Sequence, residues 1–503
     1  MSEQHIPSAD IGRHMAKGAA WAILMRLAVR GLGVISTLIL ARLLAPEDYG
    51  MIAMATVLLG AVEGITSFGF DAVLVQDQNA GPDKYDTAWT LGVIRGVVLG
   101  GAFALAAPFL ADFYHEPRLV PLIQLLALGT FIEGFESVGI VDFRKQLRFD
   151  RDFTLQLIPR LVSFFATLLL ASVLHNFWAL AYGILIGRSS RIVTGFVMHP
   201  YRPRFTLARW REIFHFSKWL MVNSALRFVD NSGDTLVLGR YVPPAILGFY
   251  TLAYEISNLA LTELVAPIQR ALLPGYARIA NDYATLRSTY MTTFSITIML
   301  ALPVAVGIAV TAQSSIPILL GETWLPCVPL VQILSISGAL RLAVANSGAA
   351  YLAIGKPAYT TLLYAGTAVV SVPLLIFGAR EAGPIGAALA MTAAGAVFAS
   401  ANLLVLNKVI GIRLSDLARV ILRSCAASVA MGSVVSLLQD YWPQSGGLVL
   451  LIARLAALCT CGALVLATVQ FGLWLAASRP PGPEQALVNS LLQRFRGRAG
   501  SNA

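Results

Sequence analysis

Residues 40–50 read Leu40-Ala-Arg42-Leu-Leu-Ala-Pro46-Glu-Asp-Tyr-Gly50, and a weaker copy stands at residues 238–248 as Leu238-Gly-Arg240-Tyr-Val-Pro-Pro244-Ala-Ile-Leu-Gly248. The arginine, proline and glycine keep their spacing at an offset of 198 residues. A second pair follows in the same order, Pro121-Leu-Ile-Gln124-Leu-Leu and Pro329-Leu-Val-Gln332-Ile-Leu, at an offset of 208. Many membrane transporters consist of two related halves around a central site. The repeat therefore predicts two similar halves.

The composition is that of a membrane protein. Hydrophobic residues make up 57% of the chain and charged residues 13%, whereas a globular chain has about 25% charged residues. The mean hydropathy is +0.71. The apolar segments are continuous rather than alternating with a period of two, which excludes a membrane β-barrel. We expect an all-α polytopic membrane protein, in which each span needs about 20 apolar residues.

The apolar runs predict about fourteen transmembrane helices. An offset near 198 residues covers six of them, an even number, so both halves start on the same side of the membrane. This predicts two pseudo-symmetric six-helix lobes around a central cavity, with two extra C-terminal helices. The expected helices cover about residues 18–43, 47–70, 87–111, 118–141, 155–175, 177–198, 219–240, 245–268, 288–311, 327–354, 358–378, 384–408, 417–438 and 447–477.

Lysine and arginine gather in alternate loops, which predicts cytoplasmic N- and C-termini. The net charge of +10 then reflects this bias, not nucleic-acid binding. The first apolar run is expected to be an uncleaved span. We expect a cytoplasmic segment at 1–17, an N-lobe at 18–199, an inter-lobe loop at 200–218, a C-lobe at 219–410, helices 13 and 14 at 411–478, and a basic cytoplasmic tail at 479–503.

Several spans carry ionisable residues that lipid cannot solvate. Helix one holds Arg26 and Arg30, four residues apart and hence on one face. Helix seven holds Arg227, Asp230, Asn231 and Asp234 at helical spacing on one side. Arg341 lies in helix ten. Because helices one and seven begin their lobes, we expect these polar faces to line a shared cavity.

Arginine donors match the oxygens of a diphosphate, so Arg26, Arg30, Arg227 and Arg341 are the predicted substrate-binding residues. Glu63, Asp230, Asn231, Asp234 and Glu255 are the predicted cavity and coupling residues. Ion pairs within one lobe, or arginines reaching the membrane surface, are the alternative for Arg95, Arg160, Arg188, Arg191 and Arg454. Both interpretations stay open for Glu133 and Glu136. We expect no catalytic residue, cofactor, metal site or disulfide.

The segment from Trp21 through residues 40–53 resembles the N-terminal signature of bacterial polysaccharide transporters of the Wzx and colanic-acid type. Asp86-Thr-Ala-Trp89, Phe109-Leu-Ala-Asp-Phe-Tyr114 and Gly248-Phe-Tyr-Thr-Leu-Ala-Tyr254 extend the likeness over nearly the whole chain. The resemblance implies two six-helix bundles that alternate between inward-open and outward-open states. It also implies a bacterial inner-membrane location and an undecaprenyl-diphosphate-linked oligosaccharide as substrate, for exopolysaccharide, capsule or lipopolysaccharide synthesis.

The same superfamily contains multidrug exporters and the lipid II flippase. Arg30 and Arg42 have the spacing of two arginines in the lipid II flippase signature, which supports Arg30 as a substrate contact and Arg42 as structural. The aspartates that follow in that flippase are absent here, since residues 35–38 are apolar or hydroxylic. This difference favours the polysaccharide branch.

Two other functions stay open. A cation-coupled multidrug exporter of the same fold predicts a cavity of aromatic and acidic residues with little arginine. A membrane glycan polymerase predicts a large periplasmic loop, which the spacing of the apolar runs does not provide. Coupling to a proton or sodium gradient, and contact with the polymerase and chain-length regulator of the same pathway, are further expectations. No nucleotide-binding motif occurs, so direct ATP coupling is not expected.

Overall fold

The structure is a computed structural model, and it describes residues 29, 31–66, 74, 75, 77, 80–146, 148–441, 447–477 and 485. Within these residues every regular element is a helix, as the sequence predicts. Seven described helices are long and apolar enough to cross a membrane, or eight if a bent pair counts as one span. The predicted residues Arg26 and Arg30 lie outside the described residues, so the start of helix one stays a prediction.

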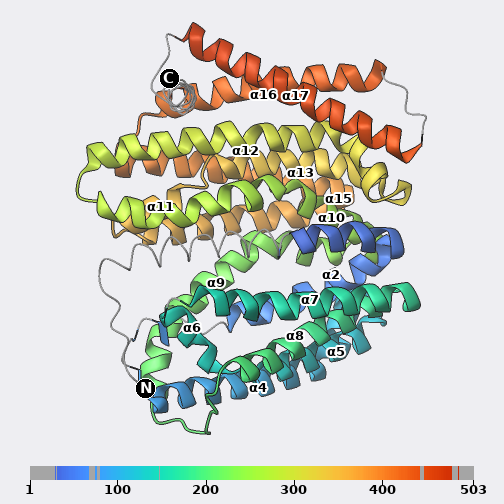
Figure 1. Ribbon diagram of the computed structural model, residues 1–503, viewed down its shortest axis with the longest axis vertical. Coiled ribbons are helices and arrows are strands. Elements are labelled where there is room, and N and C mark those ends of the chain that lie inside the picture. The colour runs from blue at the N-terminus through green and yellow to red at the C-terminus, as the bar shows by residue number, and fades with distance from the viewer. Residues whose placement is uncertain are drawn as a thin grey trace, which may run out of the picture. The chain divides into compact units, whose positions relative to one another are not determined.

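The chain packs as two compact units, Met1–Gly248 and Phe249–Ala503. In the first unit α4 packs on α5, α7 on α8, α5 on α8, and α2 on α9; Figure 1 shows α7 running along α8. The described elements of this unit are a helix at Gly31–Leu43, α2 (Pro46–Ile65), α4 (Pro82–Tyr114), α5 (Leu119–Glu133), η1 (Val138–Ile140), α6 (Val141–Lys145), α7 (Phe149–Leu174), α8 (Trp178–Met198) and α9 (Trp210–Gly239).

In the second unit α12 packs on α13 and α16, α13 on α15, and α16 on α17. Its described elements, beginning with the helix that crosses the boundary between the units, are α10 (Pro244–Ser257), η2 (Ala260–Val265, a π-helical turn), α11 (Ala266–Arg278), α12 (Tyr283–Leu319), η3 (Glu322–Trp324), α13 (Cys327–Leu342), α14 (Ser347–Ala353), α15 (Ala358–Ile410), α16 (Leu414–Tyr441) and α17 (Leu448–Ala476).

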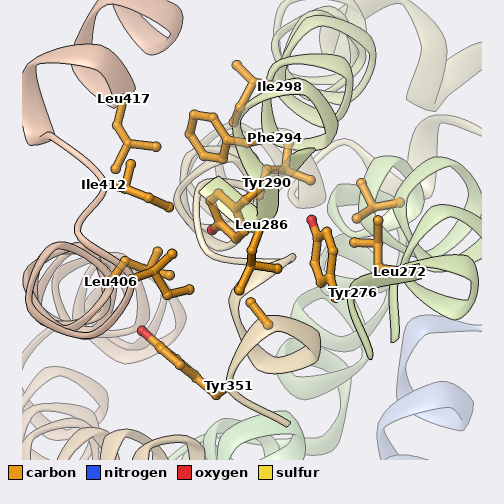
Figure 2. Packing of buried hydrophobic residues seen from close by; sticks show 14 of the residues in the cluster. Leu272, Tyr276, Leu286, Tyr290, Phe294, Ile298, Tyr351, Leu406, Ile412 and Leu417 are labelled. Carbon is orange, nitrogen blue, oxygen red and sulfur yellow. The ribbon is translucent and has the colours of Figure 1, made fainter. Parts of the chain in front are cut away.

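A large hydrophobic cluster lies in the second unit. Figure 2 shows Tyr290 between Phe294 and Leu286, with side chains of α11, α15 and α16 around them. The Tyr290 and Phe294 rings stack with centroids 6.1 Å apart. This core holds α12 against the start of α16, whose Leu417 is buried in the same cluster.

Two predicted helices, 358–378 and 384–408, form one hairpin that the 53-residue α15 covers. The break lies at Ala382 and Gly383, and Gly383 has a φ of 56°, a value that suits glycine. The two limbs touch through backbone, since a Cβ on Gly386 would lie 2.0 Å from the carbonyl oxygen of Gly378. Glycine at both positions therefore permits the tight return.

Other predicted spans are interrupted. The predicted helix 118–141 ends at Glu133 and resumes after η1 at a bend of 65°. The predicted helix 327–354 ends at Leu342, and α14 begins at Ser347. The predicted helix 245–268 changes to a π-helical turn at Ala260. Hydropathy averages over such breaks, because the short connections are themselves largely apolar.

The second repeat found in the sequence reappears as a shared burial pattern. The buried residues of α5 are Leu119, Leu122, Ile123, Leu126, Ala127, Gly129 and Thr130. Moved by the offset of 208, each falls on a buried residue of α13, from Cys327 to Gly338. Both helices are also followed by a break and a short helix. The repeat thus extends beyond the matching letters to the face that each helix buries.

The first repeat forms a reciprocal contact. A Cβ on Gly50 would lie 1.7 Å from the carbonyl oxygen of Pro244, and a Cβ on Gly248 would lie 1.9 Å from that of Pro46. Each copy of the Pro-x-x-x-Gly turn therefore rests on the backbone of the other copy. Only a residue without a side chain permits this approach, which explains why proline and glycine keep their spacing in both copies.

Candidate functional site

One face of α8 carries two arginines, and a histidine follows the helix. Arg188 and Arg191 are three residues apart, which brings both side chains to one side of the helix, and His199 lies directly beyond its end. Their acidic partners come from other elements of the first unit, α2, α5 and α6. The face is thus a line of cross-helix ion pairs.

The arginine cluster, as we name Glu63, Thr130, Glu133 and Arg188, lies at the middle of the 21-residue α8. Arg188 Nη1 lies 3.1 Å from Glu63 Oε1 and 2.8 Å from Glu133 Oε2. Thr130 Oγ1 donates to the same Glu63 oxygen at 3.2 Å. Two carboxylates from different helices therefore share one guanidinium.

The arginine cluster is only partly buried. The side chains of Arg188, Glu63 and Glu133 are 22%, 26% and 46% exposed. Gly129 makes room for the arginine stem, because a Cβ there would lie 3.3 Å from Arg188 Cδ. An ionised group at membrane depth costs at least a few kcal/mol when it faces lipid. We therefore expect the exposed parts of these side chains to face water and not lipid.

A second pair continues the line. Arg191 Nε donates to Glu136 Oε1 at 2.6 Å, so Glu136, beyond the end of α5, meets α8 as well. Pairing within one lobe was the predicted alternative for Arg188 and Arg191, and these contacts confirm it. The cluster around Arg188 was not among the predicted substrate residues, although Glu63 was a predicted coupling residue. The matching spacings of Glu133–Glu136 and Arg188–Arg191 were the available signal.

The predicted polar stripe of α9 faces more than one environment. Arg227 and Asn231 are exposed and Asp230 is half-buried, whereas Asp234 is 1% exposed. Asp234 Oδ1 accepts a hydrogen bond from the Thr235 amide at 2.7 Å. On a neighbouring face, Phe228 packs on Gly60 and Gly64 of α2. The role of Arg227 in binding a ligand stays a prediction.

In the second unit, Arg341 Nη1 donates to the hydroxyl of Tyr254 at 3.0 Å, linking α13 to α10. Glu255 follows on α10 and is exposed. A cavity of about 660 Å³ lies between α12, α13 and α16, and its polar lining is Gln313, Gln332, Ser335, Ser436, Gln439 and Asp440. None of the predicted site residues lines this cavity. Within the described residues, no group of three or more His, Cys, Asp or Glu is arranged to hold a metal ion.

Comparison with known proteins identifies the sequence family. The model of a family described as "Polysaccharide biosynthesis protein" matches residues 39–329. The lipopolysaccharide biosynthesis protein WzxC of Escherichia coli is 26% identical over 74% of this chain and 76% of its own length. The teichuronic acid biosynthesis protein TuaB of Bacillus subtilis is 22% identical over 92% of this chain and 97% of its own length.

Solved structures share the fold. The lipid II flippase MurJ in an inward closed conformation superposes with a TM-score of 0.74 at 13% identity, covering 91% of this chain and all of MurJ. An inward-facing multidrug resistance MATE family transporter gives a TM-score of 0.62 at 15% identity, covering 78% of this chain and 96% of that one. At these identities the likeness concerns the fold alone. This chain is therefore a multi-pass helical membrane protein with the fold of these transporters.

Proposed function

We propose that this chain, which belongs to the polysaccharide biosynthesis protein family, moves an oligosaccharide linked to undecaprenyl diphosphate across the bacterial inner membrane. Translocation runs from the cytoplasmic to the periplasmic leaflet by alternating access of two six-helix lobes. The chain acts as a transporter and not as an enzyme. Its cargo serves exopolysaccharide, capsule or lipopolysaccharide synthesis.

The observation that carries the proposal is the shared arginine of the cluster. Arg188 stands at the middle of α8, a predicted span, between Glu63 and Glu133, and a fixed charge at membrane depth is costly. A purely structural ion pair needs one carboxylate for one guanidinium. A second carboxylate leaves an excess negative charge that a proton or a cation has to balance when no anionic ligand is present.

A diphosphate that reaches the arginine cluster offers Arg188 a better partner. Guanidinium binds phosphate oxygens through two parallel hydrogen bonds, and the diphosphate carries more charge than either glutamate. When Arg188 turns to the phosphate, Glu63 and Glu133 lose their cation and take up protons. Substrate binding and proton binding are thereby linked, so transport should respond to an imposed proton gradient.

The residues predicted from sequence complete this proposal. Arg26 and Arg30 of helix one, Arg227 of α9 and Arg341 of α13 supply further guanidinium groups for the diphosphate or the sugars. Asp230, Asn231, Asp234 and Glu255 join Glu63 as cavity and coupling residues. Their meeting in one central cavity is part of the proposal.

A multidrug exporter is the second candidate, since the MATE fold is shared. The described spans favour an anionic cargo instead. Arg188, Arg191 and Arg341 all stand within predicted spans and contact polar groups of other elements. An exporter of cationic drugs has no evident use for arginine at these positions.

The experiment compares two arginines that each bind two glutamates. Arg188→Gln should reduce polymer export at least tenfold in a deletion strain, with normal membrane insertion. Arg118→Gln is the matched control, because Arg118 pairs with Glu47 at 2.6 Å and Glu116 at 2.8 Å but is 51% exposed beyond the end of α4. Arg188→Lys retains the charge without the two-bond geometry and should export at an intermediate level.

Three outcomes contradict the proposal. Full export by the Arg188→Gln protein excludes a role for this guanidinium in translocation. Equal loss in the Arg118→Gln control shows that ion-pair removal damages the fold wherever it occurs. Purified protein that fails to accelerate the transfer of an undecaprenyl-diphosphate sugar between leaflets of a liposome excludes the flippase function itself.

A further inference from the structure

A strap of chain, residues 199–211, joins α8 to α9 and crosses the first turns of α4 in the first unit. Three of its backbone amides donate to α4 side chains: Arg204 N to Asp86 Oδ1 at 3.0 Å, Thr206 N to Thr90 Oγ1 at 3.0 Å, and Arg209 N to Thr87 Oγ1 at 3.3 Å. The hydroxyl of Tyr201 also donates to Asp86. The strap is therefore held by its backbone.

Because the backbone faces α4, many strap side chains turn outward. Phe205 packs on the Trp89 ring of α4 with centroids 4.8 Å apart and is still 70% exposed, and Leu207 and Trp210 are 46% and 45% exposed. The arginines at positions 202, 204, 209 and 211 are exposed as well. Apolar and cationic side chains thus alternate along one outward surface. A loop in bulk water gains nothing from presenting a phenylalanine and a tryptophan, whereas the boundary between headgroups and acyl chains suits both kinds of side chain.

The charge of the outward surface is positive. Four arginines stand in residues 202–211, and the acidic residue next to them, Glu212, binds Arg209 at 2.8 Å. Two nearby carboxylates are bound within the protein. Asp86 accepts hydrogen bonds from Tyr201 and from the strap backbone, and Asp142 contacts Tyr85 and His199. Burial and the neighbouring Asp86 raise the pKa of Tyr201, so its hydroxyl stays a donor and the anchor adds no negative charge.

Two of these arginines also stack on aromatic rings. The Arg211 guanidinium lies 5.6 Å from the Trp210 ring, and that of Arg202 lies 5.5 Å from the Phe196 ring. A guanidinium stacked on a ring keeps N–H donors at its edge, where they can bind phosphate oxygens. One nitrogen of Arg202, Nη1, already donates to the carbonyl oxygens of His199 and Tyr201 at 2.9 and 3.0 Å. The position fits as well, because α4 is a span and its first turns mark the level of the membrane surface.

We propose that the strap binds the phosphate headgroups of anionic phospholipids, with Phe205, Leu207 and Trp210 inserted at the headgroup boundary. Each arginine near an anionic surface favours such lipids by about fivefold. The strap then fixes the end of α4 and the start of α9 at the membrane surface. This inference is independent of the cargo, since it concerns the bilayer and not the transported molecule.

The test places the full chain in nanodiscs of phosphatidylcholine and phosphatidylglycerol at a ratio of four to one. Either lipid carries brominated acyl chains, which quench nearby tryptophan fluorescence. The chain has 8 tryptophans, so the Trp210 signal is taken as the difference from a Trp210→Phe protein. Quenching per brominated lipid should be about fivefold stronger for phosphatidylglycerol, and 0.5 M salt should reduce the preference in the unchanged protein.

The variant R202Q/R204Q/R209Q/R211Q should lose the preference but keep the quenching. The matched control, R380Q/K408Q/R413Q/R419Q, removes the same charge from exposed positions of the second unit and should keep the preference. Equal quenching by both lipids in the unchanged protein overturns the proposal. So does an absence of quenching by either lipid, which would place the strap in water and favour a soluble partner. Soluble glycerol phosphate that abolishes the preference would also overturn it.

Discussion

At the scale of single residues, the geometry around Arg188 makes two carboxylates compete for one cation. Glu63 Oε1 already accepts from Thr130 and Arg188, whereas Glu133 is the more exposed of the two acids. When an anion draws Arg188 away, both glutamates lose the charge that stabilises their ionised forms. The cluster thus has the elements of coupled anion and proton binding.

Replacing both carboxylates tests whether the cluster couples transport to proton binding. The variant E63Q/E133Q keeps the shape of the side chains but binds no proton, so transport should lose its response to an imposed pH gradient. Transport of the lipid-linked sugar by reconstituted protein, measured with and without the gradient, gives the answer. E47Q/E116Q is the matched control, since it removes the two partners of Arg118 at an exposed site. A gradient response that survives in E63Q/E133Q would remove the cluster from the coupling mechanism.

Asp86 is the second residue whose role can be tested by substitution, since it anchors the strap. It is 8% exposed and accepts from both Tyr201 and the Arg204 amide. Asp86→Ala removes the acceptor of two part-buried donors, and each such hydrogen bond contributes about 0.5–1.5 kcal/mol, so the strap should detach. Trypsin, which cuts after arginine, should then cleave within residues 202–211 much faster. Asp83→Asn, in the same first turn but exposed, should digest like the unchanged protein; equal digestion of all three would exclude the anchor.

At the scale of elements, hydropathy predicted where the chain is helical but not where the helices break. The ends of α8 and α17 lie within a residue of the predicted limits, because charged and polar residues flank both runs. The break after Glu133 was missed because Gly134 and Phe135 are apolar. Its cause is tertiary: a Cβ on Gly134 would lie 2.9 Å from Gly96 Cα, so α5 approaches α4 too closely to continue straight.

The candidate site shows the same limit. Glu63 was singled out from sequence because a carboxylate within a span is costly. Its partner Arg188 lies 125 residues away, and no local pattern indicates which of several arginines turns toward it. Sequence identified which residues need a partner, and the packing of α2, α5 and α8 determined the pairs.

The crossing of α2 and α10 gives an element-scale prediction. Gly50→Ala or Gly248→Ala places a Cβ within 2 Å of a backbone oxygen of the other turn. Backbone cannot yield as a flexible side chain does, so each variant should lose about 1–3 kcal/mol of stability and unfold at lower temperature in detergent. Gly101→Ala is the control, since no atom lies within 4 Å of its Cβ position; alanine there should be neutral or stabilising by up to about 1 kcal/mol. Unchanged melting of both turn variants would contradict the close contact.

At the scale of the whole molecule, the internal repeat of the sequence is also a repeat of buried positions in the structure. Seven buried positions of α5 recur in α13, although few of the residues are identical. The same face of each helix is buried, although the residue types on that face differ. The sequence therefore indicated the repeat from two short motifs, whereas its extent became visible only from burial.

The length of α4 predicts that its two ends lie on opposite sides of the membrane. Its 33 residues extend about 50 Å at 1.5 Å per residue, more than the roughly 30 Å of the hydrocarbon core. The strap is bound at its first turns, and Arg118 lies beyond its end, so residues 118 and 208 belong to opposite sides of the membrane. The excess of arginine in the strap predicts that residue 208 lies on the cytoplasmic side. In a background with Cys327, Cys425, Cys459 and Cys461 replaced, Arg118→Cys should react with a membrane-impermeant maleimide in spheroplasts. Ala208→Cys should react only after the membrane is opened. The reverse result would invert the topology and place both termini outside, and labelling of both cysteines from one side would exclude α4 as a span.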